Sequence, residues 1–187
     1  MNCLSCRSKS CRTGESCGGE KFQREKILAK YHREKEAAVV ETAAKLVDGG
    51  RAGTLSRVEE LLEFVKTSDY KKVGLAYCYG MENLAEDVRR LFTERDIRCI
   101  GISCTCGAMG QNEINQKSEL PGVSCNPISQ AKQMEAEGVD LAVVIGLCMG
   151  HDVLFTREFS GDQTTLLVKD RPNNHAPLSG ITKLLSS

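Results

Sequence analysis

The sequence predicts an α/β fold: a mostly parallel sheet of about four strands flanked by helices, with a small cysteine-rich metal-binding module at the amino-terminal end. Two observations carry this prediction. Short apolar segments alternate with amphipathic helical segments over residues 71–187, which is typical of a parallel sheet covered on both faces. Four cysteines fall among the first 17 residues, in a stretch almost free of large apolar side chains.

The composition is that of an ordinary soluble protein. Hydrophobic residues make up 41% of the 187 residues and charged residues 27%, and 25 basic side chains balance 25 acidic ones. No basic excess favours nucleic acid, so no nucleic-acid partner is expected. The longest strongly apolar run, 141–149, is too short to span a membrane, and the first residues lack the apolar core of a secretory signal. We therefore expect a cytoplasmic protein without a membrane association, whose ten cysteines are reduced.

Three stretches divide the chain. Residues 1–20 contain too little apolar surface to offset their ordering entropy, so they are either disordered or tied by a ligand. Residues 21–70 form a helical segment that packs on the core. One helix is expected to contain Ile27 to Val47 and to end near Asp48, and a second to begin at about Thr54. Ser56 and Glu59 have the spacing of a capping box at this second start.

The α/β domain covers residues 71–187. Its apolar segments predict four strands, and the helical periodicity predicts a helix over 83–95. Asn126 and Pro127 are suited to the cap and first turn of a further helix that runs to about Glu137. The predicted strands are 71–78, 97–104, 139–148 and 164–170.

The amino-terminal cysteines predict a first metal site. Their spacing, Cys3-x2-Cys6-x4-Cys11-x5-Cys17, places four thiolates close enough in sequence to surround one tetrahedral zinc ion or one iron–sulfur cluster. It resembles a zinc knuckle with cysteine in the histidine position, and also short ferredoxin-like loops. The spacing does not choose between zinc and iron–sulfur. The alternative is a flexible basic tail with free thiols.

A second group of cysteines follows the predicted strands. Cys78, Cys104 and Cys148 end three strands, and Cys125 directly precedes the Asn126 helix start. Because ligands of open α/β sheets bind outside the carboxyl ends of the strands, we expect these four sulfurs to converge on a second metal or iron–sulfur centre. Cys106 is a possible substitute ligand. The alternative is that two or three of these are buried core thiols, as expected for the mid-strand Cys99.

The segment Gly146-Leu-Cys148-Met-Gly-His151-Asp offers an enzymatic alternative. It has the form of a nucleophile elbow and resembles the Gly-x-Cys-x-Gly-His segment of class I glutamine amidotransferases. In this interpretation Cys148 is a nucleophile for amide or acyl chemistry, with His151 or His175 as its base. The distant His-x-Glu pair of that family is not matched, since His175 is followed by Ala176 and Pro177.

The motifs together resemble the domain-of-unknown-function 1847 family of small bacterial and archaeal proteins described as predicted metal-binding. The resemblance rests on the Cys-x2-Cys-x4-Cys start, the strand ends LAYC (75–78) and GISC (101–104), the GLCMGHD turn, TTLLVKDR (164–171) and His-x-Pro (175–177). It implies metal binding through the cysteine-rich start and brings no established reaction.

The sequence therefore predicts a protein that binds zinc or an iron–sulfur cluster at one or two sites. Redox chemistry or electron transfer is the expected use, with a redox protein partner or a small-molecule substrate. Two alternatives stay open: a cysteine-nucleophile enzyme at Cys148, and a zinc-stabilised interaction module. The sequence does not give the oligomeric state.

Overall fold

The computed structural model describes residues 2–15 and 23–186. The chain divides into two compact units, Met1–Ala52 and Gly53–Ser187, which are described in turn. In the described part of the chain, no helix combines the length and the apolar character needed to cross a membrane.

The described part of the first unit contains two α-helices where the sequence predicted one. The backbone is extended at Arg33, with φ −74° and ψ 147°, and this residue separates the two helices. Charge explains the break, because Lys30 lies in the last turn of the first helix while Glu34 and Glu36 lie in the first turn of the second. These positions favour a helix end followed by a helix start. The elements are η1 (Ser10–Thr13), α1 (Arg24–Tyr31), α2 (Glu34–Lys45) and η2 (Asp48–Gly50).

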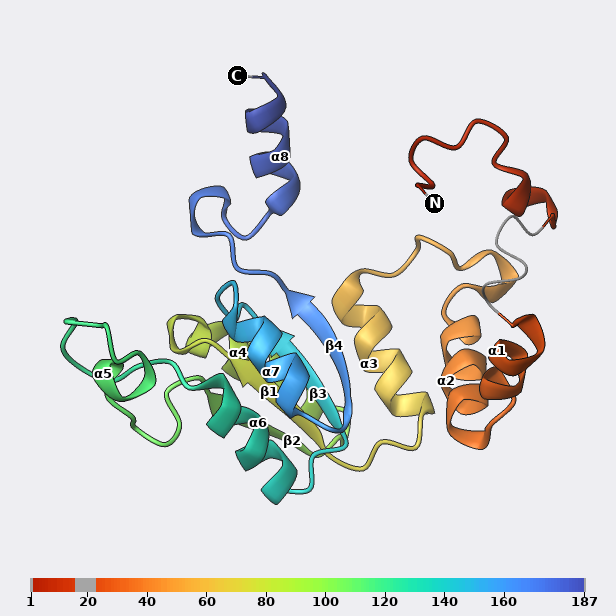
Figure 1. The fold of residues 1–187 in the computed structure, drawn as a ribbon. Helices are drawn as coiled ribbons and strands as arrows, with labels where there is room; N and C mark the ends of the chain where they lie inside the picture. The colour runs from red at the N-terminus through yellow and green to blue at the C-terminus, as the bar shows by residue number, and fades with distance from the viewer. Residues whose placement is uncertain (1, 16–22, 187) are drawn as a thin grey trace. The chain divides into compact units, whose positions relative to one another are not determined.

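The second unit is built on a four-stranded parallel sheet, which confirms the predicted α/β class (Figure 1). The strand order is β2-β1-β3-β4, so the direction of winding reverses between β1 and β3. The pairing is in register, with Tyr77 at the end of β1 opposite both Ser103 of β2 and Ile145 of β3. The strands are β1 (Val73–Tyr77), β2 (Cys99–Ser103), β3 (Leu141–Ile145) and β4 (Asp162–Leu167).

Helices cover both faces of this sheet. Apolar side chains of α3 and α4 pack with one face, and those of α6 and α7 pack with the other, which in Figure 1 is the face toward the viewer. α3 begins with the predicted capping box of Ser56 and Glu59, and α6 begins with Asn126, whose side chain accepts a hydrogen bond from Ser129 N. The elements are α3 (Arg57–Thr67), η3 (Tyr79–Met81), α4 (Glu82–Thr93), α5 (Gln111–Ile114), α6 (Pro127–Ala136), α7 (His151–Glu158), η4 (Arg171–Asn173) and α8 (Pro177–Ser186).

The alternation of side chains along β1 determines which face receives its cysteine. Val73 and Leu75 belong to the core cluster with α3 and α4, whereas Ala76 and Cys78 belong to the cluster with α6 and α7. This follows from the two-residue period of a strand. Cys78 therefore points toward the face where α6 begins.

Gly74 of β1 packs tightly on the same face as Ala76. A Cβ atom added there would lie 2.8 Å from Val139 Cγ1 and 3.1 Å from Met134 Sδ, both within the buried cluster. The close approach of α6 and the start of β3 to β1 therefore requires glycine at this position.

We predict that Gly74→Ala destabilises the protein by about 1–3 kcal/mol, because the added methyl group forces the packed neighbours apart. Urea unfolding followed by circular dichroism measures the change. Gly80→Ala is the matched control, since a Cβ there meets open space, and its effect should stay within about 0.5 kcal/mol. Equal stabilities of the two variants would contradict the packing argument.

Candidate functional site

Three strands deliver cysteines to the carboxyl edge of the sheet. Cys104 directly follows β2, Cys78 directly follows β1, and Cys148 lies three residues after β3. The ladder continues past the strand ends, with Cys104 N donating to Tyr77 O at 2.9 Å and Cys78 N donating to Ile145 O at 3.2 Å. Because β1 lies between β2 and β3, Cys78 follows the central strand of the three. This edge includes the β1–β3 reversal, the place where open α/β sheets bind ligands.

A fourth cysteine reaches this edge from the loop before α6. The sulfur of Cys125 lies 3.5 Å from that of Cys104, and Asn126 N donates to Cys104 O at 2.6 Å. The fully buried Gln130 of α6 donates from Nε2 to Tyr77 O and to Ile102 O, at 3.1 and 2.7 Å. These bonds tie the start of α6 to the ends of β1 and β2. They hold Cys125 against Cys104.

A lysine that the sequence analysis did not single out completes the site. Lys169 Nζ lies 2.5 Å from the sulfur of Cys78. The sequence predicted 164–170 as a strand, but β4 ends at Leu167, so Lys169 emerges at the same carboxyl edge as the cysteines. The rule that strand ends carry the site would have identified Lys169, had the end of this strand been placed correctly.

The thiols differ in acidity because their surroundings differ. Burial raises the pKa of Cys78, but the hydrogen bond from Lys169, the backbone N–H of Gly80 and the lysine charge outweigh it, so the pKa lies below its usual value. Burial raises the pKa of Cys104 to about 12, although Tyr79 N donates to its sulfur at 3.3 Å. Burial also raises the pKa of Cys148, opposed by the charges of Lys169 and Arg171. The edge thus combines one acidified thiol with less acidic neighbours.

Four cysteine sulfurs are ligands of the type that a thiophilic metal ion prefers, but the side chains at this edge are not arranged around a common point. Cys78 and Cys104 are each 1% exposed, while Cys125 and Cys148 are partly exposed. In a tetrahedral zinc site with Zn–S bonds of about 2.3 Å, the sulfurs are about 3.8 Å apart, close to the Cys104–Cys125 separation of 3.5 Å. No three His, Cys, Asp or Glu side chains of residues 2–15 and 23–186 are, however, arranged to share a metal as they stand. Coordination would require side-chain rotation.

Two further cysteines lie near this edge or within the sheet. Cys106 is partly exposed in the loop after β2, where its backbone N–H donates to Ser103 O. Among the described residues, no hydrogen bond joins its sulfur to another cysteine. Cys99 begins β2 and packs partly buried against the α3/α4 core cluster, away from the strand ends.

The amino-terminal cysteines lie in the first unit. Cys3 and Cys11 are exposed, Cys6 is half-buried, and Cys17 lies outside the described residues. The backbone N–H of Lys9 and then the hydroxyl of Ser8 lower the pKa of Cys6, and the Lys9 ammonium donates to Cys3 O. The backbone of this segment thus stabilises a negative charge on Cys6. The predicted four-cysteine site is not tested by these contacts.

The geometry gives the nucleophile hypothesis no support. His151 contacts Cys148 through its backbone N–H, which donates to Cys148 O at 2.9 Å. The Nδ1 atom of His175 accepts from Asp170 N at 3.0 Å and so has a structural role in the turn after β4. In the described chain, no hydrogen bond joins either imidazole to the Cys148 sulfur. A nucleophilic cysteine needs a base within such reach.

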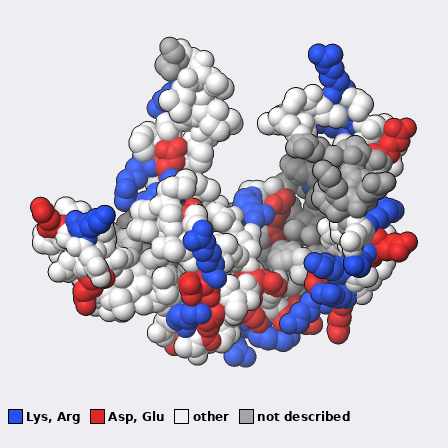
Figure 2. Space-filling view, viewed as in Figure 1, with Lys and Arg blue, Asp and Glu red and all other residues white. Residues whose placement is uncertain are grey.

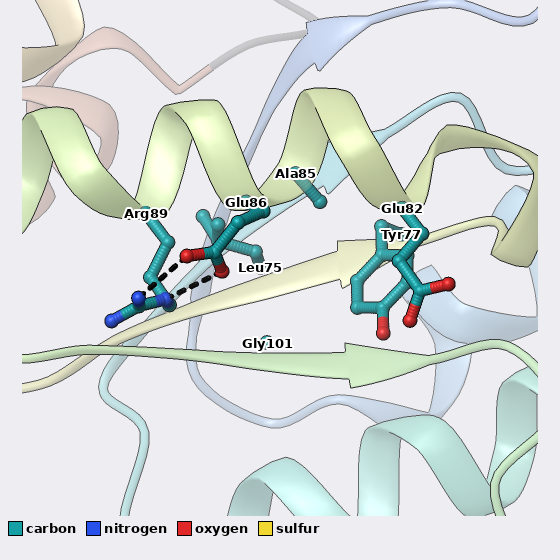
Figure 3. A pocket seen from close by; sticks show the side chains of 7 residues that line it. All are labelled: Leu75, Tyr77, Glu82, Ala85, Glu86, Arg89 and Gly101. Carbon is teal, nitrogen blue, oxygen red and sulfur yellow. Dashed lines mark hydrogen bonds and ion pairs between the residues drawn. The ribbon is translucent and has the colours of Figure 1, made fainter.

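A separate pocket of about 160 Å³ lies on the opposite face of the sheet, between α4 and the strands β1 and β2 (Figure 3). Glu86 accepts two hydrogen bonds from Arg89 at its edge, at 2.7 and 2.6 Å. None of the lining residues is a cysteine, so this pocket is distinct from the thiol site. They are Leu75, Tyr77, Glu82, Ala85, Glu86, Arg89 and Gly101.

Charged side chains of both signs are interspersed over the face seen in Figure 2, and neither sign forms a continuous patch there. This agrees with the balanced composition of 25 basic and 25 acidic residues.

Cys99 gives a prediction for alkaline pH. Burial raises its pKa to about 12, with Arg89 opposing the rise and Glu86 adding to it. Because an unfolded thiol ionises near pH 8.5, the contribution of Cys99 to stability is complete below that pH and is lost as the pH rises toward 12. We predict that the difference in unfolding free energy between wild type and Cys99→Ala shrinks from pH 8 to pH 11, by urea unfolding with a reductant present. A difference independent of pH would contradict this assignment.

Comparison with known proteins identifies the family of this chain. A family model described as "Protein of unknown function (DUF1847)" matches residues 16–166, which include all four cysteines at the carboxyl edge. The chain is also 33% identical over 178 residues to the uncharacterized protein MJ0455 of Methanocaldococcus jannaschii, covering 94% of this chain and 90% of that relative. The chain belongs to the DUF1847 family.

Proposed function

We propose that this protein binds a metal ion or an iron–sulfur cluster through the thiolates of Cys78, Cys104, Cys125 and Cys148. The observation that carries the proposal is their common location: four cysteines from four separate chain segments lie at one edge of one sheet, in or against the same buried cluster. If these cysteines were only small core residues, no particular location would be expected for them. Three of the four follow strand ends, which is where such sheets bind ligands.

Metal coordination explains the thiols better than a disulfide does. All nine cysteines in the described part of the chain are free. The Cys104 and Cys125 sulfurs are 3.5 Å apart, well beyond a disulfide bond of about 2.05 Å. Four soft thiolates in a mostly apolar surrounding suit zinc or an iron–sulfur cluster, and the donor set alone does not choose between them. Iron would support electron transfer with a redox protein or a small-molecule substrate, whereas zinc would make the site structural.

The amino-terminal set Cys3, Cys6, Cys11 and Cys17 is proposed as a separate centre, independent of the edge site. Its support is the acidified Cys6 and the short spacing of the four thiols. A zinc ion there would give the interaction module considered in the sequence analysis.

Replacing Cys104 by Ser tests the edge site. We predict that Cys104→Ser loses one metal equivalent, or the iron and acid-labile sulfide of one cluster, because a ligand thiolate is removed from the buried side of the site. Elemental and sulfide analysis of protein purified without oxygen measures the loss. Metal content equal to that of the wild type would contradict the proposal.

Two variants serve as controls for this experiment. Cys99→Ala removes a partly buried thiol from β2, the strand that Cys104 follows, and should leave the metal content unchanged. Cys6→Ser should remove the metal bound at the amino-terminal site instead. The metal losses of Cys6→Ser and Cys104→Ser should therefore add in the double variant. If Cys6→Ser alone removed all bound metal, the edge site would be excluded and the amino-terminal site retained.

A further inference from the structure

Lys169 and Arg171 are two cations without acidic partners at the thiol edge. In the described ranges, no carboxylate forms an ion pair with either side chain. The Lys169 ammonium instead donates to the Cys78 sulfur at 2.5 Å. The positive charges of both residues act on Cys148 as well. A partly buried lysine whose hydrogen-bond acceptor is a sulfur fits a site that carries negative charge.

The turn after β4 fixes this arrangement. Asp170 lies between the two cations, but its carboxylate accepts two hydrogen bonds from Asn173 Nδ2, both at 3.0 Å. Asp170 N donates to His175 Nδ1 at 3.0 Å, and His175 N donates back to Asp170 O at 2.7 Å. These bonds close the turn and engage the one acidic side chain between the cations. Asp170 therefore does not compete with the Cys78 sulfur for the Lys169 ammonium.

The charges of the site and of the two cations match. Four thiolates around a divalent ion, or around a cubane core of charge +2, leave a net charge of about −2. Lys169 and Arg171 together supply +2. Removing a residue that hydrogen-bonds to a metal ligand commonly weakens metal binding by about 10- to 100-fold.

We propose that Lys169 is a positioning residue of the metal centre, which donates a hydrogen bond to the metal-bound sulfur of Cys78 and offsets part of the charge of the complex. This inference rests on the proposed function, because it requires Cys78 to be a ligand.

Cobalt(II) titration of full-length protein tests the role of Lys169. Sulfur-to-cobalt charge-transfer bands and intense visible bands report tetrahedral thiolate coordination. All proteins carry Cys6→Ser, so that the edge site dominates the signal. We predict that Lys169→Met keeps the one-cobalt endpoint but binds about 10- to 100-fold more weakly. Lys169→Arg, which keeps the charge and a donor, should recover most of the affinity.

Lys72→Met is the matched control. Lys72 is also partly buried, but it directly precedes β1, at the opposite end of the sheet, and pairs with Glu137 at 3.2 Å. Its substitution should leave cobalt affinity unchanged, and urea unfolding checks that both variants fold. Unchanged or tighter binding by Lys169→Met would overturn the inference while leaving the metal site intact. If the parent shows no thiolate–cobalt bands that depend on Cys104, the proposed function fails and the role of Lys169 fails with it.

Discussion

The parallel pairing of β1 with both β2 and β3 is the constraint on which the thiol edge depends. Because Tyr77 lies opposite both Ser103 and Ile145, the residues after the strands begin at the same level of the sheet. A shift of one residue in either pair would turn a cysteine to the other face. The fully buried Gln130 of α6 reinforces this alignment, because its side chain donates hydrogen bonds to backbone carbonyl groups near the ends of β1 and β2. The apolar packing of α6 and α7 then includes Cys78 and Cys104 in the buried cluster, with Cys125 and Cys148 partly buried against it.

Electrostatics explains why such a cluster of thiols is tolerated without a disulfide. Burial keeps Cys104 a neutral thiol, which needs no counter-charge, whereas Lys169 supplies one for Cys78. Ligand thiols must lose their protons when a metal ion binds, so the Lys169 charge favours that step at Cys78, whereas burial opposes it at Cys104. The residues that stabilise the metal-free edge are therefore those that would also surround the filled site.

The sheet and most of its cysteines could be predicted from sequence because they depend on local patterns. Apolar runs located all four strands, and the Ser56 and Asn126 caps located the starts of α3 and α6. The break between α1 and α2 was missed because apolar periodicity continues across Arg33 and the opposing charges decide the boundary. Lys169 was missed because its role arises only when β4 ends at Leu167 and the turn closes through His175. The place where β4 ends depends on the contacts of that turn, which the apolar spacing does not show.

X-ray absorption of anaerobically purified Cys6→Ser protein tests the central claim most directly, because it counts the ligand atoms around any metal that the protein retains. The account predicts a first shell made only of sulfur, with four neighbours at about 2.3 Å if the metal is zinc. A first shell of oxygen or nitrogen, or a variant that retains no metal, would contradict the convergence of Cys78, Cys104, Cys125 and Cys148 on one centre.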